Sequence, residues 1–270
     1  CCPNVHRLCV QVLLVVELHW CSMSNPEAGV PCDFPVPARY RGIALPGVGG
    51  VDLWCAEDAA ELLDMVRYRE EFKQKNELMP YWGEIWTSAY LLAFVVALGQ
   101  IPWRGDRKVV EIGAGTGLPG VVLAKLGCSV TLTDVAEDAL RILQIHCREN
   151  GLDATERCTV RELDIFHPHE TRDIARSYDL LIGADVLFEK RMGAAVSRTL
   201  EHLLSAEGEA IIADPCRETA SSFFEVLERG GWRYTEVRYP CEDLEALGIS
   251  DPKAPCRLIR VRRRWAETAF

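Results

Sequence analysis

The chain lacks several features that would assign it to a special class of protein. The apolar run Val10–Leu18 is too short to span a bilayer, and Gln11 and Glu17 interrupt it. The twelve cysteines include no C-x-x-C pair, so their spacing favours reduced thiols over a disulfide framework. His167 and His169 have no partner at ligand spacing, and we therefore expect no metal site.

Positive charge is also scarce, because 30 Lys and Arg residues face 40 Asp and Glu residues and the formal net charge is −10. An acidic chain without a basic stripe is a poor partner for nucleic acid or for an anionic membrane. We expect a cytoplasmic monomer that binds neither. Five arginines near the C-terminus lie in an alternating stretch, which indicates the solvated face and end of a last strand. They are Arg257, Arg260, Arg262, Arg263 and Arg264.

The chain divides into three parts in this interpretation. It starts with Cys1 rather than methionine, and we expect Met23 to be the natural start, with residues 1–22 as upstream sequence that is not native. A real extension is the alternative. Residues 23–100 are expected to form an N-terminal extension whose helices pack on the sheet, and residues 101–270 to form the main domain.

Hydrophobic periodicity predicts a regular alternation of strands and helices in the second half of the chain. Five strands are expected at 108–112, 129–133, 158–163, 179–184 and 209–213, with helices near 118–127, 136–150, 168–177, 190–204 and 218–229. Two further strands, 232–239 and 256–264, alternate with period two and are separated only by an acidic loop, 240–255. Upstream, we expect loop and edge strand at 24–50, an amphipathic helix at 57–75 and a buried helix at 86–98.

This order of elements predicts an α/β fold. We expect a Rossmann-like seven-strand sheet, mostly parallel with a terminal antiparallel hairpin, and helices on both of its faces. That is the plan of class I S-adenosylmethionine (SAM) methyltransferases.

The most informative segment is VVEIGAGTGLPG at 109–120, followed by a second strand that ends at Asp134. An apolar strand that runs into alternating glycines is typical of a nucleotide-like ligand lying against a strand-to-helix turn. Asp134 comes at the distance where a carboxylate accepts hydrogen bonds from ribose hydroxyls. A cap for the following helix is the alternative role of Asp134.

The glycines fit two patterns. Gly115, Gly117 and Gly120 satisfy G-x-G-x-x-G of dinucleotide enzymes, whereas Glu111 with Gly113, Gly115 and Gly117 satisfies E-x-G-x-G-x-G of SAM enzymes. Glu111 favours SAM, because a carboxylate at the strand end opposes a pyrophosphate and can pair with the methionine ammonium. The backbone of Gly113, Gly115 and Gly117 would flank that methionine part. An exposed strand-end charge is the alternative for Glu111.

With these patterns in place, the chain resembles the protein-lysine methyltransferase-like family, which includes the methyltransferase-21-like enzymes, the electron-transfer-flavoprotein β-subunit lysine methyltransferase and bacterial relatives labelled nicotinamide N-methyltransferase-like. Three segments carry the resemblance besides the glycine loop. They are PYWGEIWTSAYLLA at 80–93, GADVLFEK at 183–190 and ADPCRE at 213–218. Cys216 stands where the family usually has glycine, and Glu218 where proline often follows.

The resemblance implies further site residues. Trp86 would lie against the cofactor, with core packing as the alternative, and Trp82 would share its helical face if it is already helical. Asp164 would accept from the adenine amino group while Ile165 covers the ring; a turn residue is the alternative for Asp164. Asp185 and Phe188 would face the acceptor amine, Asp185 as the catalytic carboxylate and Phe188 as the channel wall, with a helix cap as the alternative for Asp185.

These residues predict a SAM-dependent N-methyltransferase that methylates a protein lysine by in-line displacement. A small-molecule amine is the rival acceptor. An NAD(P)-dependent oxidoreductase and a non-catalytic binding protein are the alternatives from other classes. For Arg217, the sequence leaves open a contact with an acidic substrate or an ion pair with Asp214 or Glu218.

Overall fold

We describe a computed structural model of the chain over residues 29–58, 80–101, 105–153 and 157–264. The expected upstream extension at 1–22 and nearly all of the expected helix at 57–75 lie outside these residues. Among the described residues, no helix has the length and apolar character to cross a membrane.

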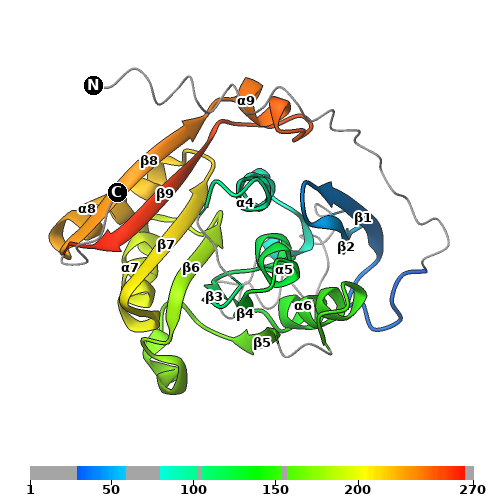
Figure 1. The fold of residues 1–270 in the computed structure, drawn as a ribbon, viewed down its shortest axis with the longest axis horizontal. Coiled ribbons are helices and arrows are strands. Elements are labelled where there is room, and N and C mark those ends of the chain that lie inside the picture. Colours follow the sequence, from blue (N-terminus) through cyan, green and yellow to red (C-terminus); the bar gives the residue numbers. More distant parts are fainter. Residues whose placement is uncertain (1–28, 59–79, 102–104, 154–156, 265–270) are drawn as a thin grey trace.

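A seven-stranded sheet forms the centre of the molecule, in the order β5-β4-β3-β6-β7-β9-β8 (Figure 1). Its strands are β3 (Lys108–Glu111), β4 (Ser129–Asp134), β5 (Cys158–Glu162), β6 (Tyr178–Ala184), β7 (Leu204–Asp214), β8 (Trp232–Tyr239) and β9 (Cys256–Arg263). The first five run parallel, and β9 pairs antiparallel with both β7 and β8. The predicted fold class is therefore confirmed, including the antiparallel end.

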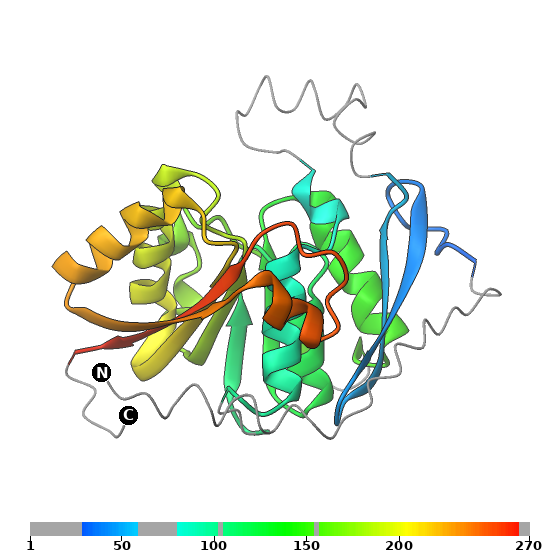
Figure 2. The same ribbon diagram turned by 90° about the horizontal axis from the view of Figure 1, so that it is seen from above.

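Helices cover the two faces of the sheet (Figures 1 and 2). One face carries α4 (Thr87–Ala97), α5 (Leu118–Lys125) and α6 (Glu137–Glu149), and the other carries α7 (Lys190–Leu203) and α8 (Ser221–Arg229). The apolar core is split accordingly into two clusters, one on each side. Because α4 is apolar around its whole circumference, it is buried, as its composition predicted.

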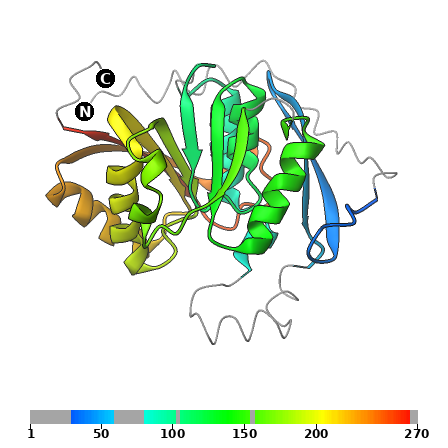
Figure 3. The same ribbon diagram turned by 90° about the horizontal axis from the view of Figure 1, so that it is seen from below.

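A β-hairpin forms a separate sheet outside the helices. β1 (Ala38–Leu45) pairs antiparallel with β2 (Gly49–Ala56), and the hairpin lies beside α6 (Figure 3). Side chains of α6 satisfy the edge of β2, since Asn150 accepts from the Asp52 backbone N–H at 3.0 Å and His146 accepts from that of Trp54 at 2.9 Å. The edge strand expected at 24–50 thus belongs to this hairpin and not to the main sheet.

Three sequence-based expectations about local structure are wrong. The helix expected at 168–177 is replaced by two single 3₁₀ turns, η4 (Pro168–Glu170) and η5 (Arg172–Ile174). The loop expected at 240–255 contains a short helix, α9 (Cys241–Ala246), which begins after Pro240. Both segments are near one helical turn in length, where periodicity carries little information.

The C-terminal arginines are the third case. They were expected on a solvated face, but Arg257 and Arg263 are buried. Arg260 and Arg262 bond to the buried carboxylate of Glu209 at 2.6 and 2.8 Å. The reason is the position of β9, which lies between β7 and β8 and not at the sheet edge. Burial by itself would raise the pKa of Glu209, but hydrogen bonds and charge from Arg260 and Arg262 lower it overall.

Candidate active site

A cavity of about 530 Å³ opens at the carboxyl ends of the parallel strands. It lies where β3 and β6 are neighbours although the chain visits β4 and β5 between them. Open α/β sheets bind ligands at such a switch point, because the loops diverge there and leave a crevice. Nine of the ten site residues predicted from the sequence line it. They are Trp86, Glu111, Gly113, Gly115, Asp134, Asp164, Ile165, Asp185 and Phe188.

Gly117 is the exception among the ten. It is the N-cap of α5 with φ +74°, and a Cβ there would lie 2.5 Å from a methyl group of Leu143. Gly120 is as constrained, since its Cβ would lie 2.4 Å from the Glu111 carboxylate. These two glycines allow α5 to pack against its neighbours.

Glu111 is buried, with 1% of its surface exposed, so the alternative of an exposed strand-end charge is wrong. One carboxyl oxygen accepts from the Gly120 N–H of α5 at 2.8 Å. Burial raises the pKa of Glu111 to about 8; that hydrogen bond lowers it and the nearby Asp134 raises it further. The carboxyl group therefore takes up a proton easily unless a cation binds beside it.

Asp134 fixes the glycine loop. Its Oδ2 accepts from the Gly115 N–H at 2.9 Å, and its Oδ1 accepts from the N–H groups of Val135 and Ala136 at 2.8 and 3.1 Å. The N-cap of α6 is Ala136, so Asp134 is not the cap of that helix. Burial raises the pKa of Asp134, and the three N–H donors oppose that shift.

A buried histidine that the sequence analysis did not single out supports the loop from the other side. His146 lies in α6; its Nδ1 is 2.7 Å from the Thr116 carbonyl in the glycine loop, and its Nε2 accepts from β2. The ring is therefore neutral and donates from Nδ1. Burial lowers its pKa to about 4. The role of His146 depends on the contact between α6 and β2, which are far apart in the sequence. A local sequence pattern could therefore not have revealed it.

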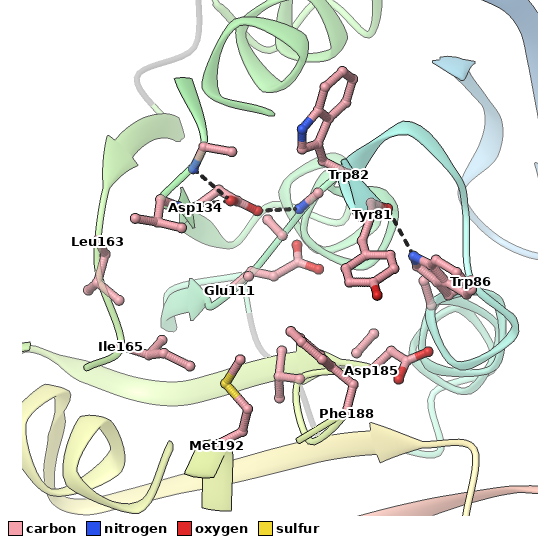
Figure 4. A pocket seen from close by; sticks show the side chains of 18 of the residues that line it. Tyr81, Trp82, Trp86, Glu111, Asp134, Leu163, Ile165, Asp185, Phe188 and Met192 are labelled. Atoms are coloured by element: carbon pink, nitrogen blue, oxygen red, sulfur yellow. Dashed lines mark hydrogen bonds between the residues drawn. The ribbon is translucent and has the colours of Figure 1, made fainter. Parts of the chain in front are cut away.

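One end of the cavity carries the residues expected for adenine (Figure 4). Asp164 accepts from the Phe166 N–H at 2.7 Å, so the turn role left open by the sequence is present. Its second oxygen is 2.7 Å from Nδ1 of His167. Ile165 and Leu163 add an apolar wall from the same segment.

The other end of the cavity is aromatic. The Tyr81 ring is T-shaped against both Trp86 and Phe188, at centroid distances of 5.9 and 5.5 Å. Tyr81 and Trp86 are partly exposed, at 44% and 37%, and the Trp86 indole N–H donates to the Tyr81 carbonyl at 3.0 Å. Tyr81 was not predicted as a site residue, although it lies in the segment PYWGEIW. It joins the rim to Phe188 (Figure 4).

The two tryptophans of that segment do not share a helical face. Trp82 lies in the 3₁₀ turn η2 (Tyr81–Gly83), whereas Trp86 is the N-cap of α4. Trp82 is 6% exposed, packs in a small apolar cluster and also lines the cavity. Trp86 contributes to the rim of the cavity.

Asp185 lies directly after β6 in the left-handed region, with φ +59°. Its carboxylate forms a two-pronged pair with Arg217, with distances of 2.8 Å from Nε to Oδ1 and 3.1 Å from Nη2 to Oδ2. The hydrogen bond to Asp185 raises the pKa of Arg217. Of the two alternatives left open for Arg217, the ion pair with Asp214 or Glu218 is thus replaced by one with Asp185. Glu189 is the N-cap of α7, so Asp185 does not cap that helix.

The residues fit SAM. The cavity places a glycine loop, the buried carboxyl group of Glu111 and the half-buried one of Asp134 between an apolar wall and an aromatic wall, which suits a cationic amino-acid end joined to a nucleoside. Together with the seven-stranded sheet and its antiparallel end, this site defines a class I, Rossmann-like SAM-dependent methyltransferase. The sequence pattern of the family described as lysine methyltransferase matches residues 73–230, and the chain belongs to that family.

Individual relatives agree with this assignment. The chain is 34% identical over 160 residues to protein N-lysine methyltransferase METTL21A of Danio rerio, a match that covers 57% of this chain and 68% of that protein. It is 30% identical over 147 residues to EEF1A lysine methyltransferase 3 of Mus musculus, covering 54% and 61%. An O-methyltransferase from Bacillus cereus, solved in complex with SAH, has a TM-score of 0.50 at 16% identity, covering 75% of this chain and 91% of that one, and shows the fold alone.

Proposed function

We propose that this SAM-dependent methyltransferase methylates lysine side chains of a protein substrate, and that one end of the cavity binds SAM while the other end binds the acceptor lysine. The observation that carries the proposal is the continuity of the cavity from the glycine loop to the aromatic rim. A cofactor and an acceptor that enter from opposite ends meet in its middle, as an in-line displacement requires.

The cofactor end is formed by residues that hydrogen bonds already hold in place. Glu111 would pair with the ammonium of the methionine part, and Asp134 would hold the ribose. Ile165 would cover the adenine. When bound, SAM supplies an electrophilic methyl group on a sulfonium. Since the glycine loop is held by Asp134 and His146, the chain presents this end with little rearrangement.

The acceptor end must orient an amine and exclude water. Tyr81, Trp86 and Phe188 form apolar walls around a narrow entrance, which suits the aliphatic stem of a lysine. Asp185 keeps lone pairs beyond those used by Arg217, so it can accept an N–H hydrogen bond and direct the nitrogen lone pair toward the methyl group. Phe188 forms part of the wall of this end.

The partly exposed rim supports a protein as the acceptor. Tyr81 and Trp86 line the cavity and are partly exposed, which suits a side chain that enters while the rest of its protein stays outside. The proposal further includes a cytoplasmic monomer. The net charge of −10 supports the part of it that excludes nucleic-acid and anionic-membrane partners.

Incubation with methyl-labelled SAM and a lysate of the source organism tests the function. The protein-lysine proposal expects a discrete labelled protein band on a gel. Label found only in the small-molecule fraction would select a small amine as the acceptor and refute the protein substrate. Glu111→Gln, assayed in parallel, controls for label that does not depend on this site.

A further inference from the structure

The backbones on both sides of the ion pair between Asp185 and Arg217 are fixed by hydrogen bonds. The Asp185 backbone N–H donates to the Ala213 carbonyl at 2.9 Å, which ties its position to β7. The Arg217 backbone N–H donates to Asp214 Oδ2 at 3.0 Å. The backbone carbonyl of Arg217 accepts a hydrogen bond from Nη2 of Arg257 at 2.9 Å. The backbones of Asp185 and Arg217 are therefore both held in place, and their side chains form the two-bond ion pair in the absence of a substrate.

The charge of this pair matters for the reaction. A lysine amine in water has a pKa near 10.4 and must be neutral to attack the methyl group. An unpaired carboxylate beside it would stabilise the ammonium and so oppose the reaction. With Arg217 in place, the carboxylate and the guanidinium together carry no net charge.

We propose that Arg217 is a positioning residue that cancels the charge of Asp185, so that the acceptor amine reaches the methyl group in its neutral, nucleophilic form. This inference rests on the acceptor end proposed above. The Asp185 oxygens then act as hydrogen-bond acceptors that orient the amine. The proton that the ammonium loses passes to bulk water at the exposed rim and is not stored on Asp185.

Other charged and titratable groups surround the pair. Tyr81 lies on the rim side, Asp214 and Cys216 follow β7, and Cys256 and Arg257 belong to β9. Among these, Asp214 and Arg257 form their own buried pair at 2.8 Å. Their charges therefore offset each other, which leaves Arg217 as the direct counter-charge of Asp185.

The test is the dependence of kcat on pH, with saturating SAM and the acceptor that the parent chain labels in the lysate. Arg217→Gln leaves Asp185 uncompensated, so the pH of half-maximal kcat should rise by about one unit or more, the usual effect of an unpaired opposite charge. Asp185→Asn leaves the positive charge of Arg217 unpaired. The pH of half-maximal kcat should therefore fall in this variant, and the maximal kcat should also drop. Arg217→Lys retains the charge and should keep the parental value. SAM affinity should stay near the parental value in all three variants.

Arg161→Gln is the matched control. Arg161 and Asp173 form a similar fork outside the cavity, at 2.6 and 2.7 Å, and the two arginines are similarly exposed, 36% for Arg161 and 38% for Arg217. This control should leave the profile unchanged. A parental profile in Arg217→Gln, or an equal shift in Arg217→Lys, would overturn the inference.

Two further outcomes are covered. If Arg217→Gln does not fold, Asp185→Asn is the deciding variant, because asparagine tolerates the positive φ of this position and the variant should fold. A kcat–pH profile of Asp185→Asn that equals the parental one, or that moves to higher pH, then refutes the inference. If the parent chain labels only a small amine, the protein substrate is refuted, while the same profiles measured on that amine still test Arg217.

Discussion

Glu111 should make SAM binding depend on proton release. Its pKa is raised to about 8 by burial, so roughly nine-tenths of the unliganded chains carry a proton on this group at pH 7. An ammonium placed beside the carboxyl favours the charged form and lowers its pKa. At pH 7, where the SAM amino group is mostly charged, binding should then release close to one proton per SAM from Glu111.

The sign of the pH effect follows directly. Because binding releases a proton from Glu111, SAM affinity should increase as pH rises toward about 8. At higher pH the α-ammonium of free SAM itself loses its proton, so the affinity should pass through a maximum and then fall. The folded pKa of Glu111 also lies above its unfolded value. The stability that this group contributes to the unliganded chain is therefore complete below about pH 4.5 and is lost as pH rises through about 8.

Calorimetry at pH 7 in two buffers of different ionisation enthalpy measures the released protons. Glu111→Gln should abolish the release. Adenosine, which shares the nucleoside but has no ammonium, should bind to the parent without releasing a proton from Glu111. Zero release with SAM, or equal release in the Gln variant, would show that the ammonium does not bind beside Glu111.

Three further predictions concern the glycine loop and the strained turn. Asp134→Ala removes the acceptor of the Gly115 N–H and should weaken SAM binding more than tenfold, or about 1.5–3 kcal/mol, measured by calorimetry; an unchanged Kd would contradict its role. The folded pKa of His146, about 4, lies below its unfolded value, so stability should fall as pH drops from about 6.5 toward 4; thermal melts of His146→Asn should show a shallower decline, and an identical one would exclude His146 as the cause. Cys216 has φ +55°, a conformation that glycine adopts without strain. Cys216→Gly should therefore relieve about 1 kcal/mol and raise the melting temperature by roughly 2–4 °C. A lower melting temperature would show that the backbone at Cys216 is not strained.

Much of the fold was accessible from local patterns. Buried parallel strands such as β6 are continuous apolar runs, and the glycine loop follows β3 directly, so the cofactor end could be predicted with Glu111 and Asp134 in place. The family usually has glycine where this chain has Cys216, and the structure gives the reason, because Cys216 adopts the left-handed conformation that favours glycine. Each of these features depends on a few neighbouring residues.

The features that were missed depend on contacts between distant segments. The pairing of Asp185 with Arg217 depends on how the ends of β6 and β7 align and on the backbone turn at Asp185. The contact of Tyr81 with Phe188 joins the segment before α4 to the one after β6. The arginines of β9 were misplaced for a related reason, since period-two alternation does not reveal whether a strand is central or at an edge.

The most direct test of the central claim is to locate the transferred methyl group. Mass spectrometry of the protein band labelled by the parent chain should place the label on the side-chain nitrogen of a lysine. Asp185→Asn, which replaces one acceptor oxygen with an NH2 group and so loses part of the orientation of the amine, should give the same site with turnover reduced about a hundredfold. Label on an arginine, on a backbone nitrogen or on a side-chain oxygen would contradict lysine methylation by this chain.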